Sequence, residues 1–582
     1  MRARLNIFIA LSALCLILTA CSERRGQVTV RIVATTDVHG NIFDTDFVDG
    51  SERKGSLAKF STFLKQQRKD YRNVIYLDAG DILQGSIEVY QDVTAQFYRE
   101  SLPAKAYSQL GCDAMAMGNH DLAVGAPSFE RFFRGMTFPA LGANLYFEQY
   151  GDYIPPYIII EKQGLRIAVI GMTTPVVAYS LPPDRNIGLN VADIVDAAKY
   201  WMPILVEQEQ ADVVIGLIHS GWNNGRMDRD EVYENSVRRL LSEVPGFDLI
   251  ICGHDHVSRC LKTVDCSGDS VLVLNPGPYA GKAAVVTLQA SFKESDKPTI
   301  LTSGSLEDIT CVEPDKAFMK RLSGWYDDVK HYSDSIIGVT SAPLDGRNVL
   351  WGESSVMDYV HSIQMGFHAA QISLSSPVFS KVYFEAGEMP IRDMFKLYRY
   401  DNTMVAVMMK GSEVKDILEY SASQFYNTVT DGSGGMLKLR KDPVSGANIP
   451  RASLNGLITA AGICYEIDVT KPAGKRVNIL SMADGGKFDP DKYYRTTINS
   501  FLYSGAESAV FKATDISLKN FSERFNTAST ADIRYYILTN FALKHEMDSK
   551  VKVETLSNWR LVPEQVVSEC LAKDTIHFSI IP

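Results

Sequence analysis

Short runs rich in valine and isoleucine alternate with helical patterns along the first half of this sequence. Five runs have the length and β-branched composition of buried strands. Two segments between them, 56–70 and 231–244, repeat apolar residues at helical spacing. This alternation predicts a layered α/β domain. The predicted strands are 28–35, 74–77, 167–172, 213–218 and 248–253.

The chain of 582 residues is too long for a single hydrophobic core. A polar stretch over 291–299 is typical of a loop, and the polar helical pattern over 314–334 is suited to joining two domains. A second mixed region of strands and helices begins near Ile336. The predicted organisation is a signal peptide over 1–20, a linker over 21–27, a first domain over 28–313, a linker helix over 314–335, a second domain over 336–560 and a tail over 561–582.

The N-terminus has the pattern of an export signal. Arg2 and Arg4 precede an apolar stretch from Leu5 to Leu18 that is too short to span a bilayer comfortably. The following "LTAC" ends at Cys21 and resembles the lipobox of bacterial lipoproteins. The resemblance implies cleavage before Cys21, a lipid on its sulfur, and an exported protein anchored to a membrane, periplasmic or at the cell surface. A plain secretory peptide with a chance cysteine is the alternative.

Five polar motifs lie at or just after the ends of predicted strands. Strand ends hold loops in fixed positions, so several such loops can converge on one site. Five of the ten histidines of the chain fall in these motifs. The motifs are "TTDVHGN" (35–41), "DAGDILQGS" (78–86), "GNHD" (118–121), "IHSG" (218–221) and "GHDH" (253–256).

The residue types in these motifs are those of metal ligands. Asp37 and His39 are separated by one residue, so an extended segment can point both the same way, and His254 and His256 repeat this spacing. Imidazole, carboxylate and amide together suit Mn²⁺, Zn²⁺, Fe or Co better than Ca²⁺. There are too many candidates for one four-coordinate ion, whereas two ions bridged by a carboxylate would use them all. Any one of these histidines alone is more often a polar residue in a local hydrogen bond, and "GNHD" alone is also typical of a capped turn.

The ordered set D-x-H-G-N, G-D-x-x-Q-G-S, G-N-H, H-S-G and G-H-x-H resembles the dinuclear metallophosphoesterase superfamily. More closely it resembles the secreted 5'-nucleotidase family, which includes bifunctional 2',3'-cyclic-nucleotide 2'-phosphodiesterase/3'-nucleotidases. The resemblance runs from Val28 to at least Phe511. It implies an α/β fold with an N-terminal four-layer α-β-β-α metallophosphoesterase domain and a C-terminal mixed α+β nucleotide-binding domain.

The resemblance also implies a site. It implies hydrolysis of phosphate esters by a water that two divalent ions (Mn, Zn, Co, Fe or Mg) activate for attack on phosphorus. His120 would face the phosphoryl or leaving oxygen, and Asp121 would either orient nearby groups or cap the next turn. The implied ligands are Asp37, His39 and His256 for one metal, Asn119, His219 and His254 for the other, and Asp81 as the bridge.

Three details favour the cyclic-nucleotide branch of this family. "ENSV" (234–237) resembles that branch, and His256 stands where 5'-nucleotidases often have glutamine. Ala123 stands where many of them have an aspartate paired with the motif histidine. The expected function is therefore a 2',3'-cyclic-nucleotide 2'-phosphodiesterase/3'-nucleotidase. The alternatives are a 5'-nucleotidase or UDP-sugar hydrolase and a non-catalytic surface binding protein, against which the intact ligand set argues.

The C-terminal domain of this family grips the nucleoside, usually between two aromatic rings. "INSFLYSGAESAVF" (498–511) resembles the segment that supplies one ring, whereas Leu457 occupies the expected place of the other. Core packing is as good an explanation for any single aromatic residue, and a surface salt bridge is the commoner role of an arginine. The candidate substrate contacts are Phe501, Tyr503, Phe425, Tyr426 and Arg392.

The net charge of −10 argues against broad binding of a nucleic-acid polymer through basic patches. It does not argue against a small phosphate substrate, because bound metal ions reverse the local field. The resemblance implies a nucleotide substrate, and the sequence leaves the oligomeric state open.

Overall fold

The computed structural model describes residues 26–94, 100–147, 154–181, 188–227, 232–292, 297–377, 381–430, 434–442, 446–504 and 508–577. The predicted signal peptide and Cys21 lie outside these residues. Within the described residues, each helix is too short or too polar to cross a membrane.

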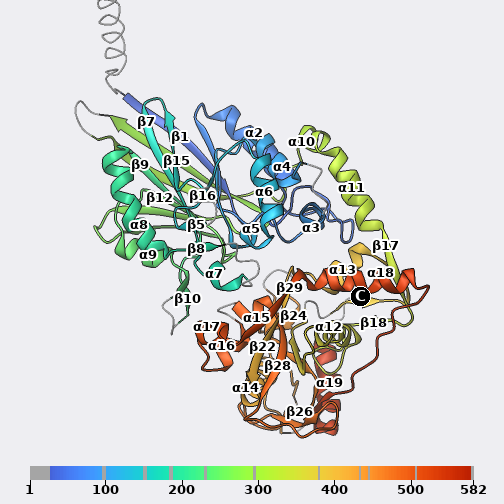
Figure 1. Ribbon diagram of the computed structural model, residues 1–582. Helices are drawn as coiled ribbons and strands as arrows, with labels where there is room; N and C mark the ends of the chain where they lie inside the picture. Colours follow the sequence, from blue (N-terminus) through green and yellow to red (C-terminus); the bar gives the residue numbers. More distant parts are fainter. Residues whose placement is uncertain are drawn as a thin grey trace, which may run out of the picture.

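Two six-stranded sheets form the N-terminal half of the molecule (Figure 1). In the first sheet four neighbouring parallel strands reach one edge, and two strands paired antiparallel complete the other side. In the second sheet four central strands run parallel, and the strand at each edge is antiparallel. The first sheet has the order β16 (Thr299–Asp308), β15 (Lys282–Phe292), β1 (Gly26–Thr35), β2 (Val74–Asp78), β3 (Ala114–Ala116) and β4 (Ala140–Leu141). The second has the order β13 (Arg259–Val264), β14 (Ser270–Asn275), β12 (Leu249–Cys252), β9 (Val213–His219), β7 (Leu165–Thr173) and β6 (Tyr157–Lys162).

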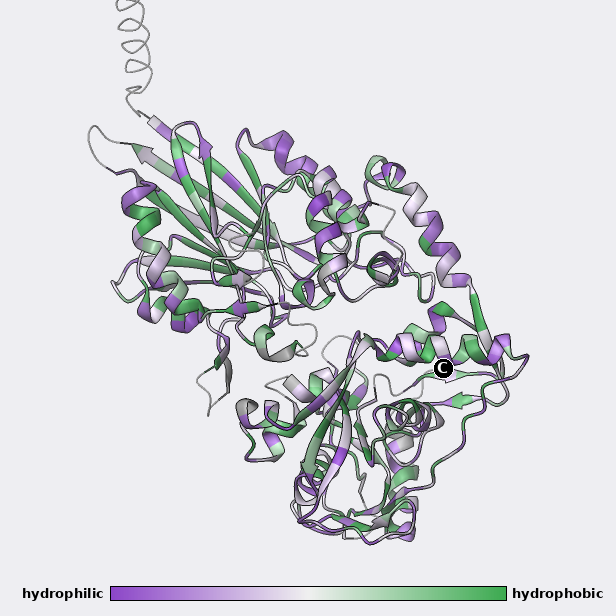
Figure 2. Cartoon of the chain, in the orientation of Figure 1, coloured by the Kyte–Doolittle hydropathy of each residue, from purple (hydrophilic) through white to green (hydrophobic). Residues whose placement is uncertain are grey.

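The two sheets pack face to face, and helices cover their outer faces. Ile32 and Leu77 of the first sheet share one buried cluster with Val169 and Leu217 of the second. These strands are hydrophobic along most of their length, as buried parallel strands are (Figure 2). The arrangement confirms the predicted four-layer α-β-β-α architecture. The helices are α2 (Leu57–Asp70), α4 (Leu102–Leu110) and α6 (Ala126–Gly135) on the first sheet's side, and α8 (Ile194–Pro203) and α9 (Val237–Glu243) on the second's.

One predicted helix is partly wrong. Residues 237–243 form α9, but the preceding segment is the strand β11 (Val232–Asn235). This strand pairs antiparallel with β10 (Asn224–Met227), and the Asn235 side chain accepts a hydrogen bond from Gly221 N–H. Backbone pairing therefore overrides the helical spacing of apolar residues in this segment.

The polar segment after the first domain forms two helices rather than one. They are α10 (Lys316–Arg321) and α11 (Ser323–Asp334), and they meet at Leu322, which is fully buried. In Figure 1, α11 runs along one side of the molecule from the first domain to the second.

A five-stranded mixed sheet lies at the centre of the C-terminal domain. Its order is β25 (Thr459–Ala461), β19 (Ile372–Ser375), β28 (Tyr493–Asn499), β22 (Thr403–Lys410) and β29 (Phe525–Asp532). A second sheet contains β27 (Val477–Met482), β26 (Ile463–Asp468) and β30 (Trp559–Val562). The helices around them include α12 (Ser355–Met365), α13 (Ile391–Leu397), α14 (Gly411–Phe425), α16 (Ala509–Ala513) and α18 (Ile533–Glu546). Short strand pairs of this domain are β17 (Ile336–Thr340) with β21 (Gly387–Pro390), β18 (Leu344–Asp345) with β20 (Tyr383–Phe384), and β23 (Leu439–Lys441) with β24 (Asn448–Pro450). The first domain has a further short pair, β5 (Leu145–Phe147) with β8 (Leu189–Val191).

The segment predicted as a tail belongs to this domain. It continues β30, which pairs with β26, and then forms α19 (Glu564–His577). Asp574 of α19 is buried and accepts hydrogen bonds from the backbone of Met436 and Leu437. This helix therefore holds the segment at Met436 and Leu437 against the domain.

The two domains pack against each other through several contacts. Arg534 is fully buried, and its guanidinium lies 4.4 Å from the ring centre of Tyr90 in the first domain and 4.5 Å from that of Phe395 in the second. Elsewhere, Val232 of the β10–β11 hairpin shares an apolar cluster with Phe511. In Figure 1, α7 (Val177–Ser180) and α15 (Ser500–Ser504) face each other across the boundary.

Candidate active site

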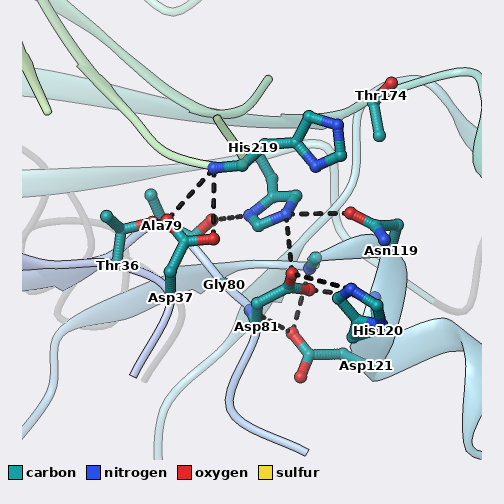
Figure 3. Close-up of polar contacts among 12 residues, drawn as sticks. Thr36, Asp37, Ala79, Gly80, Asp81, Asn119, His120, Asp121, Thr174 and His219 are labelled. Carbon is teal, nitrogen blue, oxygen red and sulfur yellow. Dashed lines mark hydrogen bonds and ion pairs between the residues drawn. The ribbon is translucent and has the colours of Figure 1, made fainter. Parts of the chain in front are cut away.

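The five sequence motifs come together at the carboxyl ends of parallel strands. Loops after β1, β2 and β3 of one sheet meet loops after β9 and β12 of the other. Parallel strands present their carboxyl ends at one edge, so the sandwich of two such sheets gathers all five loops. Figure 3 shows Asp37, Asp81, Asn119, His120 and His219 pointing toward one another.

A first group of ligand-type side chains consists of Asp37, His39 and His256. His39 Nε2 lies 3.0 Å from His256 Nε2, and His256 Nε2 lies 3.5 Å from Asp37 Oδ1. His39 Nδ1 donates to the backbone oxygen of Gln84 at 2.9 Å. A carbonyl only accepts hydrogen bonds, so Nδ1 carries the hydrogen and the Nε2 lone pair faces the group.

A second group consists of Asp37, Asp81 and His219. His219 Nε2 lies 3.1 Å from Asp81 Oδ2 and 3.1 Å from Asn119 Oδ1. Its Nδ1 donates to the Ala79 backbone oxygen at 2.8 Å, which again directs Nε2 inward. Asp37 belongs to both groups, so the two clusters are contiguous.

His254 stands beside these groups rather than within either one. Its ring centre is 5.3 Å from that of His219, and its Nε2 lies 3.1 Å from Glu234 Oε1. Its backbone N–H donates to the Asp37 carboxylate. The sequence did not single out a carboxylate partner for this histidine.

Asp37 and Asp81 are buried carboxylates that stay ionised. Burial raises the pKa of Asp37, but the hydrogen bond from His256 and the charge of His219 outweigh it and bring the pKa to about 2. Burial likewise raises the pKa of Asp81, yet interactions led by the charge of His219 outweigh it and hold the pKa well below its usual range. In the described chain, neither carboxylate forms an ion pair with a lysine or arginine. Imidazoles and backbone N–H groups offset the buried negative charge instead.

The pKa values of the histidines respond to this charge. Burial lowers the pKa of His219, but the charge of Asp81 outweighs it and raises the pKa to about 10. The His219 ring therefore holds a proton strongly, and the charge of Asp81 favours positive charge at Nε2. Burial lowers the pKa of His39, which keeps that ring neutral with a free lone pair. Ionised carboxylates with inward-facing imidazole nitrogens are the donor set of a transition-metal site, so these residues fit divalent cations.

The backbone of the candidate ligands is unusual. Left-handed φ angles, which L-residues other than glycine rarely adopt, occur at five of them. Such conformations cluster at functional sites, where the surrounding structure holds them. The angles are 48° at Asp37, 49° at His39, 66° at Asp81, 76° at His254 and 56° at His256.

Two motif glycines allow the loops to approach closely. A Cβ on Gly118 would lie 2.0 Å from Asp81 Oδ1, and a Cβ on Gly253 would lie 2.0 Å from Thr36 Oγ1 and 2.7 Å from Asp37 Oδ2. Any side chain at either position would displace a carboxylate of the cluster. The glycines of "GNHD" and "GHDH" are therefore required by packing.

His120 and Asp121, neighbours in sequence, face opposite ways. The His120 side chain is 40% exposed toward the cavities, with Nε2 3.9 Å from Asp81 Oδ2, and burial lowers its pKa to about 4. Asp121 is fully buried, and its carboxylate accepts four hydrogen bonds, from the backbone N–H groups of Gly118, Asp81, Ile82 and Leu83. Asp121 thus both orients the loop that carries Asp81 and caps the turn at Gly118.

Two cavities open beside the cluster at the domain boundary. Their volumes are about 990 and 610 Å³, and both are lined by His120, His256 and Gln84 of the first domain and by Asn402 and Phe501 of the second. Asp81, Asn119 and His254 line only the smaller cavity. A ligand in either cavity would therefore contact both domains.

Of the five predicted substrate contacts, the structure brings only Phe501 to the cavities. Tyr503, Phe425 and Tyr426 are 3%, 1% and 0% exposed and belong to the hydrophobic core of the second domain. Arg392 pairs with Asp334 at the surface and lines neither cavity. These four follow the common roles of their residue types, core packing and a surface ion pair.

Sequence reasoning did not select several cavity residues. Arg399, Tyr400 and Asn402 line the larger cavity from the second domain, and Tyr279 lines it from the first. No motif signal marks them, because only the packing of the two domains brings them to the cluster. Gln84 stands in the "DAGDILQGS" motif and was identifiable in principle.

Two domain families match the chain. Residues 30–258 match the calcineurin-like phosphoesterase family, and residues 336–515 match the 5'-nucleotidase C-terminal domain. The matches fall on the two structural halves described above.

Individual proteins are similar to most of the chain. The chain is 25% identical to a 2',3'-cyclic-nucleotide 2'-phosphodiesterase/3'-nucleotidase of Yersinia enterocolitica, over 95% of this chain and 91% of that one. It is 24% identical to the trifunctional nucleotide phosphoesterase YfkN of Bacillus subtilis over 82% of its length, which is 36% of YfkN. A solved Staphylococcus aureus structure, described as a candidate 5'-nucleotidase, has the same fold with a TM-score of 0.70 and 17% identity, covering 92% of this chain and all of that one.

The fold and the buried ligand cluster define a metallophosphoesterase, an enzyme that hydrolyses phosphate esters with the help of divalent metal ions. The chain combines a calcineurin-like phosphoesterase domain with a 5'-nucleotidase C-terminal domain. The predicted family, fold class and enzyme class are thereby confirmed.

If the cluster binds divalent cations, metal will stabilise the fold. After treatment with chelator, Mn²⁺ at about 100 times its Kd should add about 2.7 kcal/mol of stability, seen as a higher Tm by calorimetry. Asp37→Asn removes a ligand common to both groups and should abolish most of this increase. Asp196→Asn on the exposed face of α8 is the control and should retain it. An unchanged Tm increase in Asp37→Asn contradicts the assignment.

Proposed function

We propose that the protein is a 2',3'-cyclic-nucleotide 2'-phosphodiesterase/3'-nucleotidase. One observation carries the proposal: His39, His120 and His256 of the first domain and Phe501 of the second line the same cavity. A phosphate held at the cluster leaves its nucleoside within the space that Phe501 borders. The Yersinia relative that bears this name, similar over nearly its whole length, supports the choice of substrate.

Two divalent cations are the proposed cofactors. Asp37, His39 and His256 would hold one, and Asn119, His219 and His254 the other, with Asp81 between them. When bound, the cations polarise the phosphoryl group and lower the pKa of the attacking water. The proximity of Asp81 to His219 and of His39 to His256 supports this division.

His120 is the proposed contact to the reacting phosphate. Its low pKa keeps it neutral at neutral pH, so it offers an N–H donor to a phosphoryl or leaving oxygen without adding charge. Its exposure toward both cavities supports this role. Asp121 acts at a distance from the substrate, because its carboxylate holds the backbone that carries Asp81.

A 5'-nucleotidase or UDP-sugar hydrolase is the second candidate, since residues 336–515 match a domain named for 5'-nucleotidases. His256 in place of glutamine and the "ENSV" segment favour the first candidate.

Export and lipid anchoring are part of the proposal. The apolar N-terminal segment and the "LTAC" sequence support acylation of Cys21 and a periplasmic or surface location. Mass spectrometry of the exported protein should show a lipid-modified N-terminal cysteine. A free Cys21 thiol on exported protein contradicts the anchor.

The substrate assignment is tested by chromatographic analysis of products. Purified protein with Mn²⁺ should hydrolyse 2',3'-cyclic AMP and 3'-AMP faster than 5'-AMP or UDP-glucose, with 3'-AMP appearing transiently from the cyclic substrate. Asp37→Asn protein is the control for contaminating activity. A strong preference for 5'-AMP would transfer the assignment to the second candidate.

Base stacking on Phe501 is tested by substitution. Phe501→Ala should raise KM for 3'-AMP by about 5- to 150-fold, since stacking is worth about 1–3 kcal/mol per base. Hydrolysis of p-nitrophenyl phosphate, which lacks a nucleobase, should change little, and Phe501→Tyr should retain the low KM. Equal losses on both substrates would indicate a structural role for Phe501 instead.

A further inference from the structure

Glu234 is an acidic residue at the cluster to which neither the ligand set nor the proposed reaction gives a role. It lies on β11, two residues after Val232, which packs against Phe511 of the second domain. Its backbone oxygen accepts hydrogen bonds from Thr174 Oγ1 at 2.9 Å and Ser220 Oγ at 2.8 Å. These bonds fix its backbone to the ends of β7 and β9, so the position of the side chain is well defined.

The Glu234 carboxylate is turned toward His254. Oε1 lies 3.1 Å from His254 Nε2, and the two side chains are only 16% and 13% exposed. Oε2 is buried and has no hydrogen-bond partner among the described residues. An ionised oxygen without a partner is costly to bury unless positive charge lies nearby. A cation bound on this side of the cluster would compensate this oxygen.

The contact also selects a tautomer of His254. An ionised carboxylate only accepts hydrogen bonds, so Nε2 must donate and carry the hydrogen. The lone pair of a neutral ring is then on Nδ1, which has no hydrogen-bond partner within the described part of the chain. The backbone N–H of His254 is meanwhile bound to Asp37, which fixes the other end of the residue.

We propose that Glu234 is a positioning residue that holds His254 in the orientation and tautomer that bind a divalent cation through Nδ1. The proposal rests on the proposed function, which makes His254 a ligand. A carboxylate that accepts from the distal nitrogen of a ligating histidine makes the imidazole a stronger donor, and loss of such a partner lowers metal affinity about 10- to 100-fold. Because Glu234 acts through His254, its effect should fall mainly on one of the two metals.

Isothermal titration of Mn²⁺ into the chelator-treated full chain tests this without any substrate. Wild-type protein should bind two ions. Glu234→Ala should weaken one site about 10- to 100-fold and leave the other within error. Glu234→Gln keeps an oxygen acceptor at the same distance and should lose less affinity than Glu234→Ala. Glu209→Gln, at a partly exposed glutamate paired with Arg166, is the matched control and should bind as wild type does.

Several outcomes would overturn the proposal. Wild-type affinity at both sites in Glu234→Ala overturns the role of Glu234 alone. Equal weakening of both sites with a lowered Tm of the metal-free protein also overturns it, because that pattern shows a general structural role. Wild-type protein that binds no Mn²⁺ overturns the metal assignment, and the role of Glu234 with it. A substrate preference other than the predicted one leaves the metal assignment and the role of Glu234 intact.

Discussion

Two carboxylates, Asp37 and Asp81, are buried side by side at the meeting point of two sheets without a lysine or arginine paired to either in the described chain. Removing two negative charges from water is expensive unless opposite charge compensates them. Around them the structure places imidazoles, an amide and backbone N–H groups. The requirement for positive charge at this point accounts for the composition of every loop that reaches it.

The loops that surround these carboxylates have a strained backbone. Left-handed φ angles at non-glycine residues cost on the order of 1–3 kcal/mol each, and five candidate ligands adopt them. Asp121 offsets part of this cost, because its carboxylate accepts hydrogen bonds from four backbone N–H groups around Asp81 and Gly118. The rigid ends of parallel strands supply the rest of the support, so the strain is distributed over a sandwich of two sheets rather than carried by flexible loops.

The sequence was most informative where chemistry and periodicity coincide. Each valine- and isoleucine-rich run became a strand, and each polar motif after such a run reached the cluster, because the ends of parallel strands share one edge. Local pattern failed where contacts between distant segments decide the outcome. The segment 232–235 pairs as a hairpin despite helical spacing, and Phe425, Tyr426 and Tyr503 fill the second domain's core. The resemblance had already predicted Phe501 as a substrate contact, whereas only the packing of that domain brings Asn402 to the same cavities.

Both domains border the candidate site. The first holds the charged cluster, and the second lines the space beside it through Phe501, so a ligand in that space contacts both domains. The account depends above all on metal at the buried carboxylates. Anomalous diffraction from crystals grown with Mn²⁺ tests this most directly. Two peaks about 3.5–4 Å apart, both beside Asp81 and one beside Asp37, are the predicted result. The absence of anomalous density at these two carboxylates would contradict it.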